Sequence, residues 1–333
     1  MKALILNPES APLTRDIADY PDGIIIPIDK PYRWTSADVI RKIKYAAIRH
    51  FGKKNLKVGH AGTLDPLATG VLLVCIGNAT KLAETLQSHD KEYVAGITFG
   101  ATTPSYDLEK EIDRFFPHEH ITSEAVSAAL PAFIGEQDQI APLFSAKSVD
   151  GVRAYELARK LHSEGKTLDE AAQELIRVSR INISELELMH FSPYCRYEGL
   201  EDRATRGTEA GVVSEGQTVL RTFAANSAER SGGVSEANVR KPSSGSMDSH
   251  CHANNASNRI NVTDNSALGL PRASVRMACS KGTYVRAFAR DLGEALGSGA
   301  HLDSLQRSRS GIFRVENALN IEQALQKLQN DSN

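Results

Sequence analysis

The chain has 333 residues, of which 41% are hydrophobic and 24% charged, and its formal net charge at pH 7 is −2. These values suit a globular protein with a substantial core, and the charge gives no sign of a polyanionic partner, although a local basic face remains compatible with it. No apolar run predicts a membrane span or a signal peptide. The four cysteines are scattered without a C-x-x-C pair, so we expect reduced thiols in a cytoplasmic protein.

Composition divides the chain into two structured blocks and a polar insert. The insert is rich in Ser, Gly, Asn, Ala and Thr, and Phe223 is its only aromatic residue. Because so little of it can be buried, we expect it to be disordered or to form a mobile loop. The predicted parts are an N-terminal tail (1–19), a first block (20–198), the low-complexity insert (199–271), a second block (272–313) and a C-terminal helix and tail (314–333).

The first block opens with a strand-like run, Gly23–Ile28, and a helix is predicted after it. Thr35 is a favourable N-cap residue, and Asp38 three positions later resembles a capping box. Apolar residues then recur at helical spacing, whereas basic residues occupy the opposite face and the stretch that follows. Such a basic run is typical of a solvated face and equally of a phosphate-contacting surface. The apolar positions are Val39, Ile40, Ile43, Ala47 and Ile48; the basic ones are Arg41, Lys42, Lys44, Arg49, Lys53, Lys54 and Lys57.

Further strands and helices follow in mixed order. Strands are predicted at 70–77, 90–99 and 274–279, and a helix with one apolar face ends at Gly297, a favourable left-handed cap. A last helix is capped by Asn320. Because the elements lack βαβ regularity, they predict an α+β fold with a largely antiparallel sheet.

Asp65 lies in a polar loop, 59–66, that leads into an apolar strand. Gly59 and Gly62 permit tight backbone geometry, and Pro66 stiffens the exit from the loop. A carboxylate held in this way can act as a nucleophile or a general base. An Asp before Pro is also a common turn former, so the residues alone leave both interpretations open.

The run Gly59–Leu72 (GHAGTLDPLATGVL) closely resembles the catalytic motif of TruB-type pseudouridine synthases. Other segments resemble the family in the same order, and together they cover both blocks but not the insert or the extreme termini. This resemblance implies a pseudouridine synthase-like fold, with a mixed, largely antiparallel sheet flanked by helices and loops in a single catalytic domain. The further segments are Asp29–Pro31 with Thr35–Ser36, Gly77–Lys81, Asp90–Tyr93, Ser145–Lys147 with Gly151 and Ala154–Arg159, Cys279–Arg286, Asp291–Glu294, Gly299–His301, and Leu305 with Arg307.

The same resemblance implies roles for individual residues. Asp65 would be the catalytic carboxylate, and Arg286 would hold it in place, since a guanidinium can clamp a carboxylate through two parallel hydrogen bonds. Tyr93 would stack on the flipped uracil, because an aromatic face replaces the stacking lost in the RNA. Leu305 would form an apolar wall, and His60 would help displace the flipped nucleotide. Substrate binding is also implied for Lys30, Tyr155 and Lys281.

The implied reaction is isomerisation of a uridine in RNA to pseudouridine, at position 55 in the T-loop of tRNAs. The reaction breaks the N1 glycosidic bond, turns the base over and rejoins it through C5, so no cofactor and no metal is expected. The sequence agrees, since it has no P-loop, dinucleotide fingerprint or zinc spacing, and His250-Cys251-His252 lacks two further ligands. The expected partner is the T-arm of tRNA, without a membrane or an obligate protein partner.

Two departures from the family pattern affect these expectations. Pro104 stands where the family commonly has an acidic residue, although Asp107 remains. Only 20 residues follow Phe313, which leaves no room for the C-terminal RNA-binding domain of many members, so RNA binding is expected from residues 41–57 and 140–165. Alternatives are a guide-RNA-dependent synthase of the same family and a tRNA-folding factor that is non-catalytic or has both roles. A nucleoside hydrolase is disfavoured because no acidic cluster accompanies Asp65.

Overall fold

The computed structural model describes residues 3–144, 148–149, 152–154, 158, 178–193, 260 and 262–329. Met1–Arg196 and Ala253–Asn333 form one compact unit, and a second unit, Tyr197–His252, lies outside the described residues. Most of the predicted insert therefore lies outside them as well. No helix among the described residues is long and apolar enough to cross a membrane.

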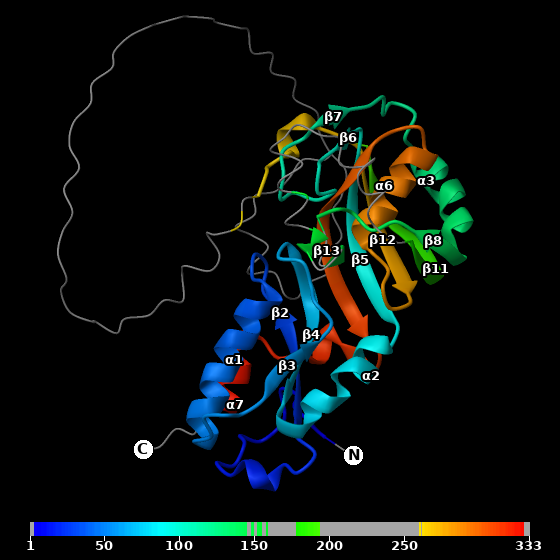
Figure 1. The fold of residues 1–333 in the computed structure, drawn as a ribbon. Coiled ribbons are helices and arrows are strands. Elements are labelled where there is room, and N and C mark those ends of the chain that lie inside the picture. The colour runs from blue at the N-terminus through cyan, green and yellow to red at the C-terminus, as the bar shows by residue number, and fades with distance from the viewer. Residues whose placement is uncertain are drawn as a thin grey trace, which may run out of the picture. The chain divides into compact units, whose positions relative to one another are not determined.

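A ten-stranded mixed sheet forms the centre of the first unit (Figure 1). All strand pairs in it are antiparallel except β1 with β2 and β13 with β4. The predicted α+β class with a largely antiparallel sheet is confirmed. The order is β1 (Leu4–Ile5), β2 (Ile24–Lys30), β4 (Ala68–Ile76), β13 (Ala300–Ser310), β5 (Lys91–Phe99), β12 (Arg272–Cys279), β11 (Ser179–Ser192) and β8 (Gly135–Gln139), with β3 (Val58–Ala61) beside β4 and β14 (Phe313–Arg314) beside β13.

Helices cover the sheet in two groups (Figure 1). Near β2 lie α1 (Ser36–Phe51) and α7 (Ile321–Lys327), and near β12 and β13 lie α3 (Ser123–Ala129) and α6 (Val285–Ala295). Another helix, α2 (Ala83–Ser88), packs beside β3. Short elements complete the described chain: 3₁₀ helices Ile17–Asp19, Gly77–Leu82, Leu130–Phe133, Ser266–Leu268 and Val315–Asn317, and strand pairs β6 (Ala101–Thr102) with β7 (Arg114–Phe115) and β9 (Ser148–Val149) with β10 (Val152–Arg153).

Each helix group buries its own hydrophobic core against the sheet. Ile43 of α1 belongs to the first core, and Phe288 of α6 belongs to the second. Tyr93 on β5 and Leu305 on β13 pack against both cores. These two side chains therefore mark the seam where the cores meet.

The local signals at the helix ends were predicted correctly. Thr35 caps α1, and its hydroxyl and the Asp38 carboxylate form the reciprocal bonds of a capping box. Asn320 caps α7 in the same way with Gln323. Gly297, two residues beyond α6, has a φ of +65°, which glycine adopts without strain.

Residues 3–19 and the end of the predicted insert both pack on the sheet unit. Leu6 and Leu13 are buried, and β1 adds a parallel strand beside β2. At the other boundary Leu270 is buried, and the Thr263 N–H donates to the Leu108 carbonyl over 2.8 Å. The packed chain is therefore longer at both boundaries than composition indicated.

Gly70 allows β13 to lie directly against β4. It has a φ of +95°, and a Cβ built there would lie 2.2 Å from the Arg307 carbonyl oxygen. Gly70 and Arg307 are register partners in the parallel pair, immediately after the Asp65 loop. Any side chain at this position would push β13 away from the loop.

We predict that Gly70→Ala costs about 3 kcal/mol of stability, the sum of left-handed backbone strain and overpacking against β13. Gly52→Ala is the matched control, because Gly52 also has a positive φ, of +62°, but has nothing within 4 Å of a built Cβ. This control should cost only about 1 kcal/mol. Urea unfolding measures the loss of stability in each variant. Equal losses would contradict the close approach of β13 to β4 at Gly70.

Candidate active site

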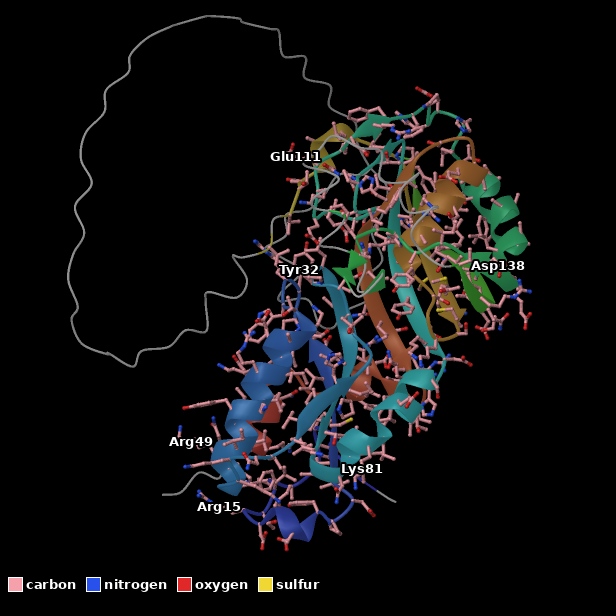
Figure 2. The ribbon with its side chains drawn as sticks, in the orientation of Figure 1. Arg15, Tyr32, Arg49, Lys81, Glu111 and Asp138 are labelled. Carbon is pink, nitrogen blue, oxygen red and sulfur yellow. The ribbon has the colours of Figure 1, made fainter. Side chains whose placement is uncertain are left out.

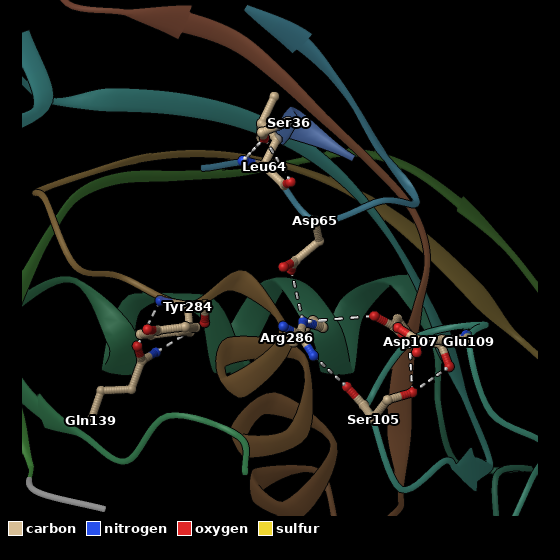
Figure 3. Close-up of polar contacts among 9 residues, drawn as sticks. All are labelled: Ser36, Leu64, Asp65, Ser105, Asp107, Glu109, Gln139, Tyr284 and Arg286. Atoms are coloured by element: carbon tan, nitrogen blue, oxygen red, sulfur yellow. Dashed lines mark hydrogen bonds and ion pairs between the residues drawn. The ribbon is translucent and has the colours of Figure 1, made fainter. Parts of the chain in front are cut away.

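Side chains from three elements hold the backbone of the loop that carries Asp65. The Ser36 hydroxyl on α1 accepts from the Leu64 N–H over 2.9 Å and lies 3.1 Å from its carbonyl (Figure 3). The Lys30 amine on β2 donates to the Pro66 carbonyl over 3.1 Å. The Arg307 guanidinium on β13 donates to the carbonyl of Gly62 over 3.2 Å. With its backbone held from three sides, the loop presents the Asp65 side chain in a fixed direction.

Arg286 reaches Asp65 from the first turn of α6. Its Nε donates to Asp65 Oδ2 over 3.0 Å, and its Nη1 donates to the Ser105 carbonyl over 3.1 Å (Figure 3). The Arg286 side chain is 6% exposed, whereas that of Asp65 is 41% exposed. One end of this pair is therefore fixed in the protein, and the other faces solvent.

Asp107 is a second carboxylate beside Arg286. Its Oδ2 lies 3.7 Å from Arg286 Nε, and its Oδ1 accepts from the Ser105 hydroxyl over 2.6 Å and from the Glu109 N–H over 2.9 Å (Figure 3). Tyr106, between Ser105 and Asp107, has a φ of +55°, which is rare for a bulky residue. The turn at Tyr106 lets the Ser105 carbonyl and the Asp107 carboxylate face the same guanidinium.

Burial and charge act in opposite directions on these groups. Burial raises the pKa of Asp107, and the charge of Arg286 together with the Ser105 hydrogen bond opposes that rise. Burial lowers the pKa of Arg286, but the carboxylates of Asp65, Asp107 and Glu109 outweigh it, so the net shift is upward. Arg286 therefore keeps a full positive charge next to Asp65.

A cavity of about 420 Å³ opens beside the pair. This volume lies within the range of roughly 300–1,000 Å³ that is typical of small-molecule sites. Asp65 is the only carboxylate among its described lining residues, whereas four lining residues are basic. Burial, and next the charge of Arg307, lowers the pKa of one of them, Lys91, to about 8. The basic lining residues are Lys91, Lys281, Arg286 and Arg307.

Tyr93 and Leu305 form the aromatic and apolar walls of the cavity. Tyr93 on β5 is the register partner of Arg307 on β13, and the two side chains are hydrogen-bonded. Burial raises the pKa of the Tyr93 phenol, although Arg307 partly opposes this shift. The result is a neutral aromatic ring near a carboxylate, an arrangement that suits a planar ring such as a nucleobase.

Comparison with known proteins gives the family. A model described as TruB family pseudouridylate synthase (N terminal domain) matches residues 49–198. A protein named tRNA pseudouridine synthase B from Phocaeicola vulgatus is 40% identical over 304 residues, which are 91% of this chain and 92% of the relative. This chain belongs to the TruB family of pseudouridine synthases.

Other proteins match at lower identity. The relative of the same name from Thermus thermophilus is 36% identical over 293 residues, covering 88% of this chain and 74% of that protein. Among solved structures, a chain in the crystal structure of a Cbf5–Nop10–Gar1 complex aligns with a TM-score of 0.49 and 20% identity, over 97% of this chain and 62% of that chain.

The structure brings five of the eight predicted site residues together around the cavity of this TruB-family protein. The predicted contact between Asp65 and Arg286 is present as one hydrogen bond, from Nε, while Nη1 donates to the Ser105 carbonyl. The expectation of two parallel bonds was therefore wrong. The five are Asp65, Tyr93, Lys281, Arg286 and Leu305.

Of the other three predicted residues, two do not line the cavity and one lies outside the described residues. His60 on β3 is half-buried, and its Nδ1 has no hydrogen-bond partner within the described chain. Burial, with the charge of Arg307, lowers the pKa of His60. Tyr155 lies outside the described residues, as does most of the segment 145–159. Lys30 is fully buried beneath the Asp65 loop.

Two residues that matter here were not predicted to take part. Arg307 supports the loop and Tyr93, and Asp107 supports Arg286, although both lie in segments that were compared with the family pattern. A signal for Asp107 existed, since it is the acidic residue that remains beside Pro104. For Arg307 the signal was only an arginine in the last long strand, which is common on sheet surfaces.

Lys30 supports the loop instead of reaching into the cavity. Its Nζ donates to the carbonyls of Pro31, Trp34 and Pro66 at 2.9, 2.6 and 3.1 Å. These acceptors match the three N–H donors of an ammonium group. Burial lowers the pKa of Lys30 to about 7, and the carboxylates of Asp65 and Asp29 oppose this shift. With all three donors engaged, Lys30 has none left for a substrate.

We predict that Lys30→Met lowers the free energy of unfolding by about 2–4 kcal/mol, because three carbonyls lose their donor. RNA affinity of the folded variant should change less than threefold. Lys281→Met is the control, since Lys281 is exposed and lines the cavity. It should weaken RNA binding and leave stability unchanged. Urea unfolding and filter binding measure the two quantities, and an Lys30→Met protein of normal stability with weak RNA binding would restore a substrate-binding role.

Proposed function

We propose that this protein isomerises uridine 55 in the T-loop of tRNA to pseudouridine, acting alone in the cytoplasm and without a cofactor or metal. The observation that carries the proposal is the Asp65–Arg286 pair at a cavity walled by Tyr93 and Leu305. The names of the relatives, tRNA pseudouridine synthase B, support tRNA as the substrate.

Each cavity residue has a separate role in the proposed reaction. Asp65 is the nucleophile or base that acts on the nucleoside, because it is the only carboxylate among the described lining residues. Arg286 aims it. Tyr93 stacks on the uracil that has left the RNA, and Leu305 covers its edge. The N1–C1′ bond breaks, the uracil turns over and a C5–C1′ bond forms. C5 then loses its proton to solvent and N1 gains one, so atoms balance without a co-reactant.

The basic face of α1 supplies a surface for tRNA phosphates. The helix starts beside the site, where Ser36 contacts Leu64, and its 16 residues extend about 24 Å away from it. Its outward face ends in Arg49, which points away from the protein in Figure 2. Arg41 is paired with Asp38 at 2.7 Å, so it is less available. Exposed basic residues without an acidic neighbour in sequence are Lys44, Arg49, Lys53, Lys54 and Lys57.

The direct test is release of tritium from C5 of labelled uridine in an isolated T-arm stem-loop, in EDTA and without other proteins or RNAs. We expect release, and tRNA sequencing should place the pseudouridine at position 55. A protein that needs a guide RNA or a partner would give no release here, and a folding factor without chemistry would bind the RNA and give none.

The same assay tests the site. Asp65→Asn should lower the rate at least about a hundredfold, since a positioned acid–base group alone is worth that much. Arg286→Lys should also slow turnover, because a point charge cannot donate to both Asp65 and Ser105 in the geometry of a guanidinium. Both variants should bind the stem-loop normally. An Asp65→Asn protein with near-normal turnover would place the chemistry elsewhere.

We predict that tRNA binding is salt-sensitive and depends on the stretch that follows α1. Replacing Lys53, Lys54 and Lys57 with Gln should lower the slope of log affinity against log salt by about 2, because each phosphate contact contributes about 0.7–0.9. The rate at saturating tRNA should not change. A control protein with Lys81, Arg114 and Arg314 replaced by Gln loses the same charge from other exposed elements. If the two triple variants have equal slopes, the phosphate surface is not on this stretch.

A further inference from the structure

The start of α6 is held by a side chain that comes from the edge of the sheet. Gln139, the last residue of β8, is 3% exposed. Its Oε1 accepts from the Tyr284 N–H over 2.8 Å, and its Nε2 donates to the Tyr284 carbonyl over 3.2 Å (Figure 3). The side-chain amide thus pairs with both backbone groups of one residue, as a neighbouring strand would.

Tyr284 is the N-cap residue of α6, and this helix has no side-chain cap of its own. Helices usually obtain such a cap from a Ser, Thr, Asp or Asn at this position. In this protein Gln139, 145 positions away, fixes the helix start instead. Arg286 follows Tyr284 by two residues, so the backbone that Gln139 holds is the backbone that aims the guanidinium at Asp65.

Two further contacts fix the same region. Nη2 of Arg290, one turn further along α6, donates to the carbonyl of Ile140 over 3.1 Å. At the other end of the turn before α6, the Ser280 hydroxyl accepts from the Asn182 N–H on β11 over 2.9 Å. Lys281 and Thr283, between these anchors, line the cavity. Gln139 is therefore the anchor nearest to Arg286.

We propose that Gln139 is a positioning residue for the reaction: through Tyr284 it sets the direction of Arg286 and so of the Asp65 carboxylate. This inference rests on the proposed function. A misplacement of about 1 Å in an active site can cost about a hundredfold in rate. Loss of the amide should therefore slow the chemical step and leave RNA binding largely intact.

The sheet offers a matched control. Gln137 lies two residues earlier on the same strand and is partly buried, and its Nε2 donates to the Phe133 carbonyl over 2.6 Å. Gln137→Met and Gln139→Met thus remove the same chemical group from the same strand, but only the second releases α6. Both are assayed on the T-arm stem-loop, below the thermal midpoint of the less stable variant.

We expect Gln139→Met to lower kcat by roughly 10- to 100-fold, with KM changed less than about threefold. Gln137→Met should change both values less than about threefold. In an Arg286→Lys background, Gln139→Met should lower kcat by less than about threefold, because groups that act through one another are not additive. If Gln139 had only a structural role, Gln139→Met would lower kcat by the same factor in both backgrounds.

Gln139→Glu gives a second readout. The glutamate keeps an acceptor for the Tyr284 N–H, and it can donate to the Tyr284 carbonyl only when it is protonated, a state that burial favours. Its rate relative to wild type should therefore rise as pH falls.

Several outcomes would overturn the proposal. Equal losses of kcat in Gln137→Met and Gln139→Met would do so, as would losses of kcat that add to those of Arg286→Lys. A Gln139→Met protein with a changed KM and a normal kcat, or failure of both Gln139 variants to fold, would also contradict it. A wild-type protein without turnover contradicts the proposed function as well, whereas an active wild type with an unaffected Gln139→Met contradicts only this inference.

Discussion

The Arg286 guanidinium is 6% exposed. Removal of its carboxylate partners would destabilise the fold, because breaking a buried ion pair costs about 3–5 kcal/mol. Arg286 on α6 takes its partners from two distant loops, Asp65 after β3 and Asp107 after β6. The fold can place the guanidinium only when all three segments are in position. The contact that orients Asp65 therefore also joins α6 to the two loops.

The two carboxylates beside Arg286 are not equivalent. The Asp107 side chain is 10% exposed and accepts from the Ser105 hydroxyl and from the Glu109 N–H. The Asp65 side chain is 41% exposed, and among the described residues it accepts from Arg286. Asp107 can thus balance the buried charge throughout a reaction. In the proposed reaction Asp65 can then change its bonding, since the guanidinium keeps Asp107 as a partner.

Local signals in the sequence predicted local structure well, but they could not reveal which distant groups meet. The capping box at Thr35 and the strand containing Gly70 depend on neighbouring residues, and the structure has both. Asp107 meets Arg286 only because the chain turns at Tyr106 with a positive φ, which no pattern indicated. The resemblance implied substrate binding for Lys30, whereas its burial follows from the pairing of β2 with β4, which is a long-range property. The family resemblance therefore predicted the residues that the structure places around the cavity, whereas the supports beneath them required coordinates.

The position of the polar insert also follows from the sheet. Ser192 at the end of β11 is the register partner of Arg272 at the start of β12, so the two strands form an antiparallel pair that a short turn could have joined. A segment inserted between register partners begins and ends at neighbouring points. Lengthening such a connection adds only about 0.6 kcal/mol for each doubling, because closure entropy grows with the logarithm of length. Both residues lie at the far end of the strands from Cys279, which leads into the turn before α6. The sheet can therefore accept a long insertion without altering the anchors of Arg286, since those anchors lie at the opposite end of the same strands.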